Sequence, residues 1–140
     1  MAGKNKNKGQ SNTYIRVEEI KKRLPSALNK NKDPKGDDFF YCAEETGKLL
    51  ADNEVSVTQI RKIFNETKKI KYGNEGIYRL RMLKAIIAYT AKRFEKQMKE
   101  FKEIFSKAID IAEDGEENLE RFKDFFEAVI AYHRAYGGKE

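Results

Sequence analysis

The sequence is poor in the side chains that most often carry chemistry in proteins. Its 140 residues include one cysteine, Cys42, one histidine, His133, and no tryptophan. A zinc or iron site needs several thiolate or imidazole ligands, so one of each cannot build it. A single cysteine also excludes an internal disulfide, and we take the cytoplasm as the default compartment. We therefore predict a cytoplasmic protein that has no metal site and no cofactor.

Motifs for catalysis are missing as well. No glycine-rich loop precedes a Lys-Ser or Lys-Thr pair, so the sequence has no phosphate cradle of the P-loop type. The acids around Asp114 cluster at a predicted turn, where solvated charge is the usual explanation. Ser56 and Ser106 lack a base within helical reach. His133 is predicted to be a buried or half-buried structural imidazole, and a donor that binds backbone is the alternative. The sequence predicts a protein that is not an enzyme.

Long apolar runs are also missing, since none approaches the roughly 20 residues that cross a bilayer. The first twelve residues contain no apolar segment of a secretory signal. The length suits one domain, and a composition of 39% hydrophobic and 37% charged residues fits a soluble helical protein. We predict a disordered basic tail over residues 1–13, which have almost nothing to bury, and a single helical domain over residues 14–140.

Apolar residues recur at helical spacing along the N-terminal half of the chain. Residues 14–24 predict a short helix that stops before Pro25, and residues 26–36 are typical of a linker. Asp37 or Asp38 is expected to cap the next helix. No stretch of the chain alternates with the period of a strand. The pattern predicts helices and no sheet.

The C-terminal half predicts longer helices. Ser56 and Gln59 form a capping box at the start of a helix that extends to about residue 70, and a turn with two glycines follows at residues 72–76. Helices are expected over residues 77–94, 95–112 and 119–136. No glycine or proline separates the helices expected over residues 77–94 and 95–112. One long helix over both ranges is therefore the alternative, and it would favour exchange of segments between chains. We predict an all-α bundle of about five helices.

Acids are scarce in one block of the chain. Residues 55–96 contain eleven Lys or Arg and three acids, whereas residues 36–54 contain one Lys and six acids. An exposed helix that is charged only for solubility usually mixes the two signs. The basic block therefore indicates an anionic partner, and a basic face that contacts only solvent is the alternative. The alternation of basic and acidic blocks also indicates that copies of the protein can stack on one another.

The helix expected over residues 77–94 indicates how these cations are arranged. At 100° per residue, an arc of long cations around small alanines lies opposite an apolar arc. We expect a polyanion backbone to approach closely between Arg81, Lys84 and Lys92. The alanines are Ala85, Ala88 and Ala91, and the apolar arc contains Leu80, Leu83, Ile86, Ile87 and Phe94, flanked by Met82 and Tyr89.

Two stretches of the sequence resemble one known family. Residues 55–64 (VSVTQIRKIF) resemble the S-x-T-Q-I-R opening of the small subunit of type III-A CRISPR effector (Csm) complexes. Residues 122–139 (FKDFFEAVIAYHRAYGGK) resemble the C-terminal end of that subunit, and residues 80–93 and 106–111 are similar in kind. The resemblance covers roughly residues 38–139.

The resemblance implies a small helical protein without catalysis of its own, which helps to assemble a ribonucleoprotein in antiviral defence. In that family, copies stack head to tail and contact the guide RNA and the paired target RNA, mainly through phosphates. Cleavage of target RNA belongs to the backbone subunits. Cleavage of single-stranded DNA and synthesis of cyclic oligoadenylate belong to the large subunit. Carried onto this chain, the RNA-binding cations are Arg61, Lys62, Lys68, Lys69, Arg81, Lys84, Lys92, Arg93, Arg134 and Lys139.

RNA binding that does not depend on base identity is also expected on physical grounds. The target sequence differs with every guide, so a useful subunit reads charge and duplex shape, as Lys and Arg do on phosphates. Most aromatic residues fall on predicted core faces, which argues against recognition of individual bases. The alternative is a helical scaffold whose basic and acidic surfaces bind each other without RNA.

Overall fold

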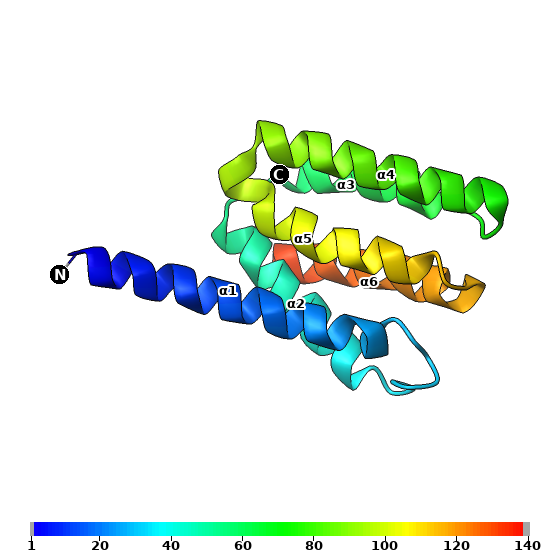
Figure 1. Ribbon diagram of the computed structural model, residues 1–140, viewed down its shortest axis with the longest axis horizontal. Helices are drawn as coiled ribbons and strands as arrows, with labels where there is room; N and C mark the ends of the chain where they lie inside the picture. Colours follow the sequence, from blue (N-terminus) through cyan, green and yellow to red (C-terminus); the bar gives the residue numbers. More distant parts are fainter. Residues whose placement is uncertain (1, 139–140) are drawn as a thin grey trace.

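Over residues 2–138 the chain folds into six helices joined by short loops (Figure 1). The structure is a computed structural model that describes the backbone of residues 2–138 and the side chains of residues 12–138. No strand occurs within residues 2–138, so the prediction of an all-α fold is confirmed. The helices are α1 (Ala2–Ala27), α2 (Asp37–Asp52), α3 (Val57–Lys68), α4 (Asn74–Arg93), α5 (Glu95–Ala112) and α6 (Glu116–Ala135).

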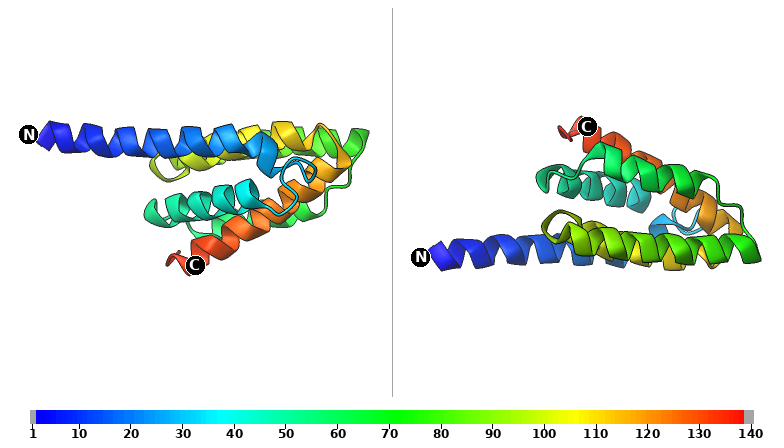
Figure 2. Two further views of the ribbon diagram at one scale, coloured as in Figure 1. Left: turned by 90° about the horizontal axis from the view of Figure 1, so that it is seen from below. Right: turned by 90° about the horizontal axis from the view of Figure 1, so that it is seen from above.

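The helices are arranged in two layers (Figure 2). In one layer α5 lies between α1 and α4, and in the other α6 lies between α2 and α3. The central helices α5 and α6 pack on each other across the layers. As a consequence, α3 and α4 together form one edge of the bundle, and α1 and α2 form the opposite edge.

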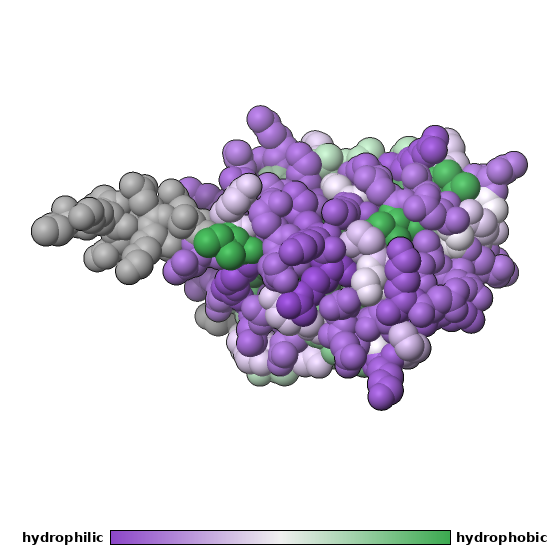
Figure 3. Space-filling view, turned by 60° about the horizontal axis from the view of Figure 1, so that its bottom comes forward, coloured by the Kyte–Doolittle hydropathy of each residue, from purple (hydrophilic) through white to green (hydrophobic). Residues whose placement is uncertain are grey.

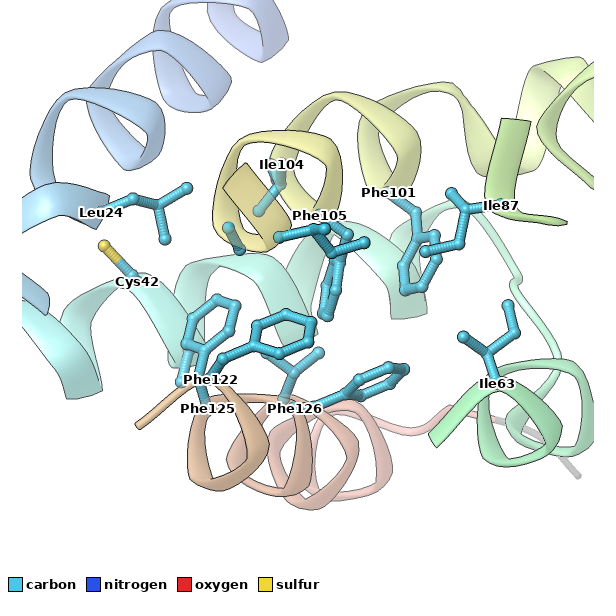
Figure 4. Close-up of a cluster of buried hydrophobic side chains, with 14 of the residues drawn as sticks. Leu24, Cys42, Ile63, Ile87, Phe101, Ile104, Phe105, Phe122, Phe125 and Phe126 are labelled. Atoms are coloured by element: carbon cyan, nitrogen blue, oxygen red, sulfur yellow. The ribbon is translucent and has the colours of Figure 1, made fainter. Parts of the chain in front are cut away.

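Phenylalanines of α5 and α6 fill the space between the layers (Figure 4). The rings of Phe101 and Phe105 stack with their centroids 4.3 Å apart, and the Phe105 ring lies 4.7 Å from that of Phe126. Phe122 and Phe125 join them, and all five side chains are fully buried. Their spacing of three and four residues turns one face of each helix inward. The apolar faces predicted for these two helices are therefore confirmed.

The N-terminus of α2 is capped by a residue that the sequence did not indicate. α2 begins after Gly36, and the predicted cap at Asp37 or Asp38 is wrong. The carboxylate of Asp33 accepts hydrogen bonds from the N–H groups of Asp38 and Phe39, at 3.2 and 2.8 Å. Asp33 lies in the loop before the helix. Its carboxylate reaches the first turn of α2 because residues 28–36 turn back on themselves. It therefore satisfies amides that the first turn of a helix leaves without partners.

α1 is longer than predicted at both ends. Its backbone is helical from Ala2, and it passes through Pro25 to Ala27 rather than stopping before the proline. Pro25 lies two residues from the helix end, where it removes only one hydrogen bond of the ladder. The buried residues Val17, Ile20 and Leu24 attach the C-terminal half of α1 to the bundle. The backbone of residues 2–13 is helical, and disorder of this tail stays a prediction.

Phe94 separates α4 from α5, which settles the question of one long helix against two. Its backbone leaves the helical region, with φ −122° and ψ 54°, and the chain then reverses so that α5 runs back alongside α4 (Figure 1). The part of the chain that the structure describes therefore has six helices rather than about five. α4 also begins at Asn74, so Gly76, which was predicted to lie in the turn, is part of the helix.

The face of the molecule in Figure 3 is mostly hydrophilic. Hydrophobic side chains appear on it only as small separate spots. Among the residues that the structure describes, no helix combines the length and the apolar character that crossing a membrane requires.

Candidate nucleic-acid interface

α3 is fixed by its N-terminal cap and by its apolar face. The hydroxyl of Ser56 accepts a hydrogen bond of 3.2 Å from the N–H of Thr58, so the predicted cap residue is confirmed. Ile60 and Ile63 are buried against the bundle, and Arg61 between them is exposed. The local sequence therefore determines which face of α3 meets solvent.

Four predicted cations lie on this outer face of α3, and all of them are exposed. Three of them, Arg61, Lys62 and Lys68, have no carboxylate within ion-pair distance in the part of the chain described. Lys69 differs because its Nζ lies 3.4 Å from Oε1 of Glu66. The outer face of α3 thus retains net positive charge that no neighbouring acid balances.

The expected cationic arc of α4 is different, and here the prediction needs correction. The Nε of Arg81 lies 2.9 Å from Oε1 of Glu113, and the Nζ of Lys84 lies 2.7 Å from Oδ1 of Asp110. Asp110 belongs to the antiparallel neighbour α5, and Glu113 directly follows that helix. Arg81 and Lys84 therefore connect α4 to the neighbouring chain segment, and each of their charges has a carboxylate partner.

The alanines of α4 also have another role than the predicted one. Ala91 is buried and Ala88 is half-buried, and both lie on the side of α4 that carries Arg81 and Lys84. Their small size permits close packing of α4 on α5. Ala85, the third alanine of the predicted arc, is exposed, so close approach of a polyanion on this side of the helix stays a prediction.

Two of the predicted cations lie in the last turn of α4 and are open to solvent. Lys92 and Arg93 are exposed, and within residues 12–138 neither has a carboxylate at ion-pair distance. The guanidinium carbon of Arg93 lies 5.3 Å from the centroid of the Phe94 ring, where the chain turns into α5. Because α3 and α4 share one edge of the bundle, these cations extend the charged surface of α3. We call Arg61, Lys62, Lys68, Lys92 and Arg93 the basic edge.

The two remaining predicted cations lie near the C-terminus. Arg134 is exposed in the last turn of α6, next to His133, whose Nε2 lies 2.7 Å from the carbonyl oxygen of Val55. That contact joins the end of α6 to the residue just before the Ser56 cap of α3. Arg134 is therefore at the same end of the bundle as the start of the basic edge. Lys139 lies outside the described residues.

The remaining candidates for chemistry are enclosed in the bundle. Cys42 is fully buried, and burial raises the pKa of its thiol to about 12. His133 is also fully buried, as predicted, and burial lowers its pKa. The residues described contain no group of three or more His, Cys, Asp or Glu that could hold a metal ion.

The outer face of α4 has an apolar stripe that the sequence analysis assigned to the core. Tyr78, Met82, Ile86 and Tyr89 are 56%, 43%, 46% and 70% exposed, respectively. The expectation that Met82, Ile86 and Tyr89 accompany the buried arc is therefore wrong. The apolar residues of α4 cover more of the helix circumference than one packing face needs. This breadth is the feature of the sequence that indicates exposure of some of them.

A groove between α3 and α4 explains part of this exposure. It has a volume of about 600 Å³, and Ile63, Leu83 and Ile86 contribute its apolar lining. Lys62 and Lys69 also line it from α3. The two helices diverge here, so Ile86 is not covered by a neighbour.

The fold and this surface define a class: a small all-α protein that presents unpaired cations along one edge of a two-layer bundle. Within that class, the chain belongs to the type III-A Csm2 family, because the family model described as Csm2 Type III-A matches residues 33–139. The protein is thus a small subunit of type III-A CRISPR Csm complexes. No curated protein and no solved structure gave a match. The helix α1 lies outside the matched residues.

Proposed function

We propose that this subunit binds the phosphate backbones of guide RNA and target RNA through the basic edge, without preference for sequence. It performs no catalysis itself and contributes to assembly of the complex together with further copies of itself and with the large and backbone subunits. This proposal rests on the family and on one observation. The cations of the basic edge are exposed and have no carboxylate partner among the described residues.

The charge pattern supports phosphates as the ligand. Each carboxylate that pairs with a cation competes with an incoming phosphate, as Glu113 and Asp110 do at Arg81 and Lys84. Arg61, Lys62 and Lys68 face no such competition in the described structure. They also lie along one helix face, at spacings that follow a strand backbone rather than surround a single small anion. Binding of this kind fixes position and carries no sequence information.

The test removes charge from α3 and leaves the fold intact. The triple variant Arg61→Gln, Lys62→Gln, Lys68→Gln replaces exposed residues with a good helix former. We expect its affinity for an RNA duplex to fall, and the slope of log affinity against log salt to become shallower by roughly 2 to 3. The measurement is fluorescence anisotropy of labelled RNA at several salt concentrations, with circular dichroism as the check on helicity.

The matched control removes the same charge from elsewhere on the molecule. Lys22→Gln, Lys99→Gln, Lys102→Gln also changes three exposed lysines, on α1 and α5, so both variants have the same net charge. We expect the control to lose much less affinity. Equal losses would mean that only net charge matters and that no defined surface binds RNA. Unchanged binding by the α3 variant would reject the basic edge.

A further inference from the structure

Tyr89 is the most exposed aromatic side chain of α4, and nothing in the described structure explains it as packing. Its side chain is 70% exposed, and among residues 12–138 it makes no hydrogen bond, ring contact or cation–π contact. A large apolar ring on a helix surface loses no contact when a ligand covers it. Tyr89 is therefore available as a flat platform.

Two unpaired cations lie one helical turn beyond this ring. Lys92 and Arg93 follow Tyr89 by three and four residues, so their side chains neighbour it on the helix surface. No acid occurs in residues 85–93, which include the turns on both sides of the ring. The ring and the two cations thus share one surface, on which an aromatic face lies beside two positive charges.

We infer that Tyr89 stacks on bases of single-stranded RNA, while Lys92 and Arg93 bind the adjacent phosphates. The inference rests on the proposed RNA binding and adds a ligand class, since backbone contacts alone do not require unpaired bases. Stacking on an aromatic ring tolerates any base, because every base has a π-face. It is therefore compatible with a guide and target whose sequences vary.

The observations favour RNA over a protein partner on this surface. Met82 and Ile86 in the same stripe would suit a protein as well as a base. The difference lies at the Tyr89 end, where covering Lys92 and Arg93 with an apolar protein surface would remove two unpaired charges from water. That desolvation is unfavourable unless anions accompany the partner. A nucleic acid strand supplies base and phosphate together.

The absence of tryptophan from the sequence permits a direct test. Tyr89→Trp gives a protein with one indole, at the position of the proposed platform. Its control is Tyr14→Trp, at a tyrosine that is 66% exposed on α1, and this helix lies at the opposite edge of the bundle from α4 (Figure 1). Each full-length variant is titrated with a single-stranded oligouridylate and with an RNA duplex of the same length, and the indole emission is recorded.

We expect oligouridylate to quench the emission of Y89W and the duplex to quench it far less, because paired bases are not free to stack. We expect neither RNA to quench Y14W. In addition, Tyr89→Leu should weaken binding of oligouridylate roughly tenfold and leave duplex binding unchanged, whereas Tyr89→Phe should retain affinity because it keeps the ring.

Three outcomes overturn the inference. If Y89W stays unquenched while oligouridylate still binds and the Arg61→Gln, Lys62→Gln, Lys68→Gln variant weakens that binding, stacking is wrong and the proposed function stands. If neither RNA binds the wild-type chain, both fail. If the emission of Y89W shifts to the blue with rising protein concentration and without RNA, a second copy of the chain covers this face instead.

Discussion

Arg81 on α4 and Glu113 at the end of α5 are paired, with the Nε of Arg81 2.9 Å from Oε1 of Glu113. Lys84 and Asp110 repeat the relationship one turn nearer the bend at Phe94. The residue numbers of each pair add to the same value, as expected of two antiparallel helices in register. The pairs therefore align α4 with α5, and they separate the cations of α4 into structural and available ones.

The first prediction uses this separation. Arg81→Gln should leave RNA affinity unchanged, because the guanidinium already has a carboxylate partner. Its effect on stability should stay below about 1 kcal/mol, since exposed ion pairs contribute little. Urea unfolding and RNA anisotropy measure the two quantities. If Arg81→Gln weakens RNA binding as much as Arg93→Gln does, the pair opens on binding and Arg81 belongs to the interface.

The second prediction concerns the close approach of α2 and α6. A Cβ at Gly47 would lie 2.6 Å from the Cβ of Tyr132 and 2.8 Å from the backbone nitrogen of His133. Because backbone must move to admit a methyl group, Gly47→Ala should destabilise the protein by roughly 1 to 3 kcal/mol despite its better helix propensity. The midpoint of urea unfolding measures this.

Gly115 supplies the control for this substitution. A Cβ there meets no atom within 4 Å, and its φ of −179° is extended backbone that any residue adopts. Gly115→Ala, at the N-cap of α6, should therefore lower the midpoint only by the small loss of capping and by less than Gly47→Ala does. A stable Gly47→Ala variant would mean that α2 and α6 can move apart without loss of core packing.

The sequence predicted those features that depend on interactions between residues close together in the chain. Ser56 caps α3 because its hydroxyl reaches an amide two residues away, and such a signal is contained in the sequence. The spacing of Phe122 and Phe126 similarly identifies an inward face without knowledge of what it packs on. For these elements the helix type, the approximate bounds and the buried residues followed directly.

Predictions failed where the partner of a residue lies outside its own helix. Nothing near Arg81 indicates Glu113, which is 32 residues away, until the reversal at Phe94 is known. Asp33 caps α2 only because the loop before the helix returns to it. Ile86 is apolar and at core spacing, yet it is exposed because α3 and α4 diverge. The spacing of apolar residues indicates which faces of a helix are apolar. It does not indicate which neighbouring helix covers each face.

The third prediction tests the N-terminal tail. In the described part of α1 the first core residue is Val17, and residues 2–13 include Gly3 and Gly9, which disfavour helix. Amide hydrogens of residues 2–13 should therefore exchange rapidly, and those of residues 17–27 should be protected, as measured by hydrogen exchange with mass spectrometry. Protection of both segments would contradict the predicted disordered tail.

The fourth prediction uses Cys42 as a probe of α1, the helix outside the family match. The Sγ of Cys42 lies 3.6 Å from the carbonyl oxygen of Ile20, beneath α1. Because burial raises the pKa of this thiol to about 12, it should react with a disulfide reagent only when α1 moves away. Leu24→Ala should accelerate the reaction and destabilise the protein by about 2 to 5 kcal/mol. Ile15→Ala, at a residue 61% exposed, should do neither.

The fifth prediction concerns the pH dependence of stability. His133 is fully buried, and burial lowers its pKa below the ordinary value of 6.5, although its hydrogen bond to Val55 opposes this. Between the lowered pKa and 6.5 the unfolded chain therefore binds more protons than the folded one, so stability rises with pH across this window. The contribution is fully present above pH 6.5 and is lost as pH falls toward the pKa of the folded state.

His133→Leu isolates this effect, because the chain has no other histidine. The variant loses the hydrogen bond to Val55 and should be less stable at pH 7.5, by roughly 1 to 3 kcal/mol. Its stability should nevertheless change less between pH 7.5 and 5.5 than that of the wild type, since carboxyl groups contribute equally to both proteins. Urea unfolding at the two pH values gives the comparison. Parallel pH profiles would show that the pKa of His133 is the same in the folded and unfolded states.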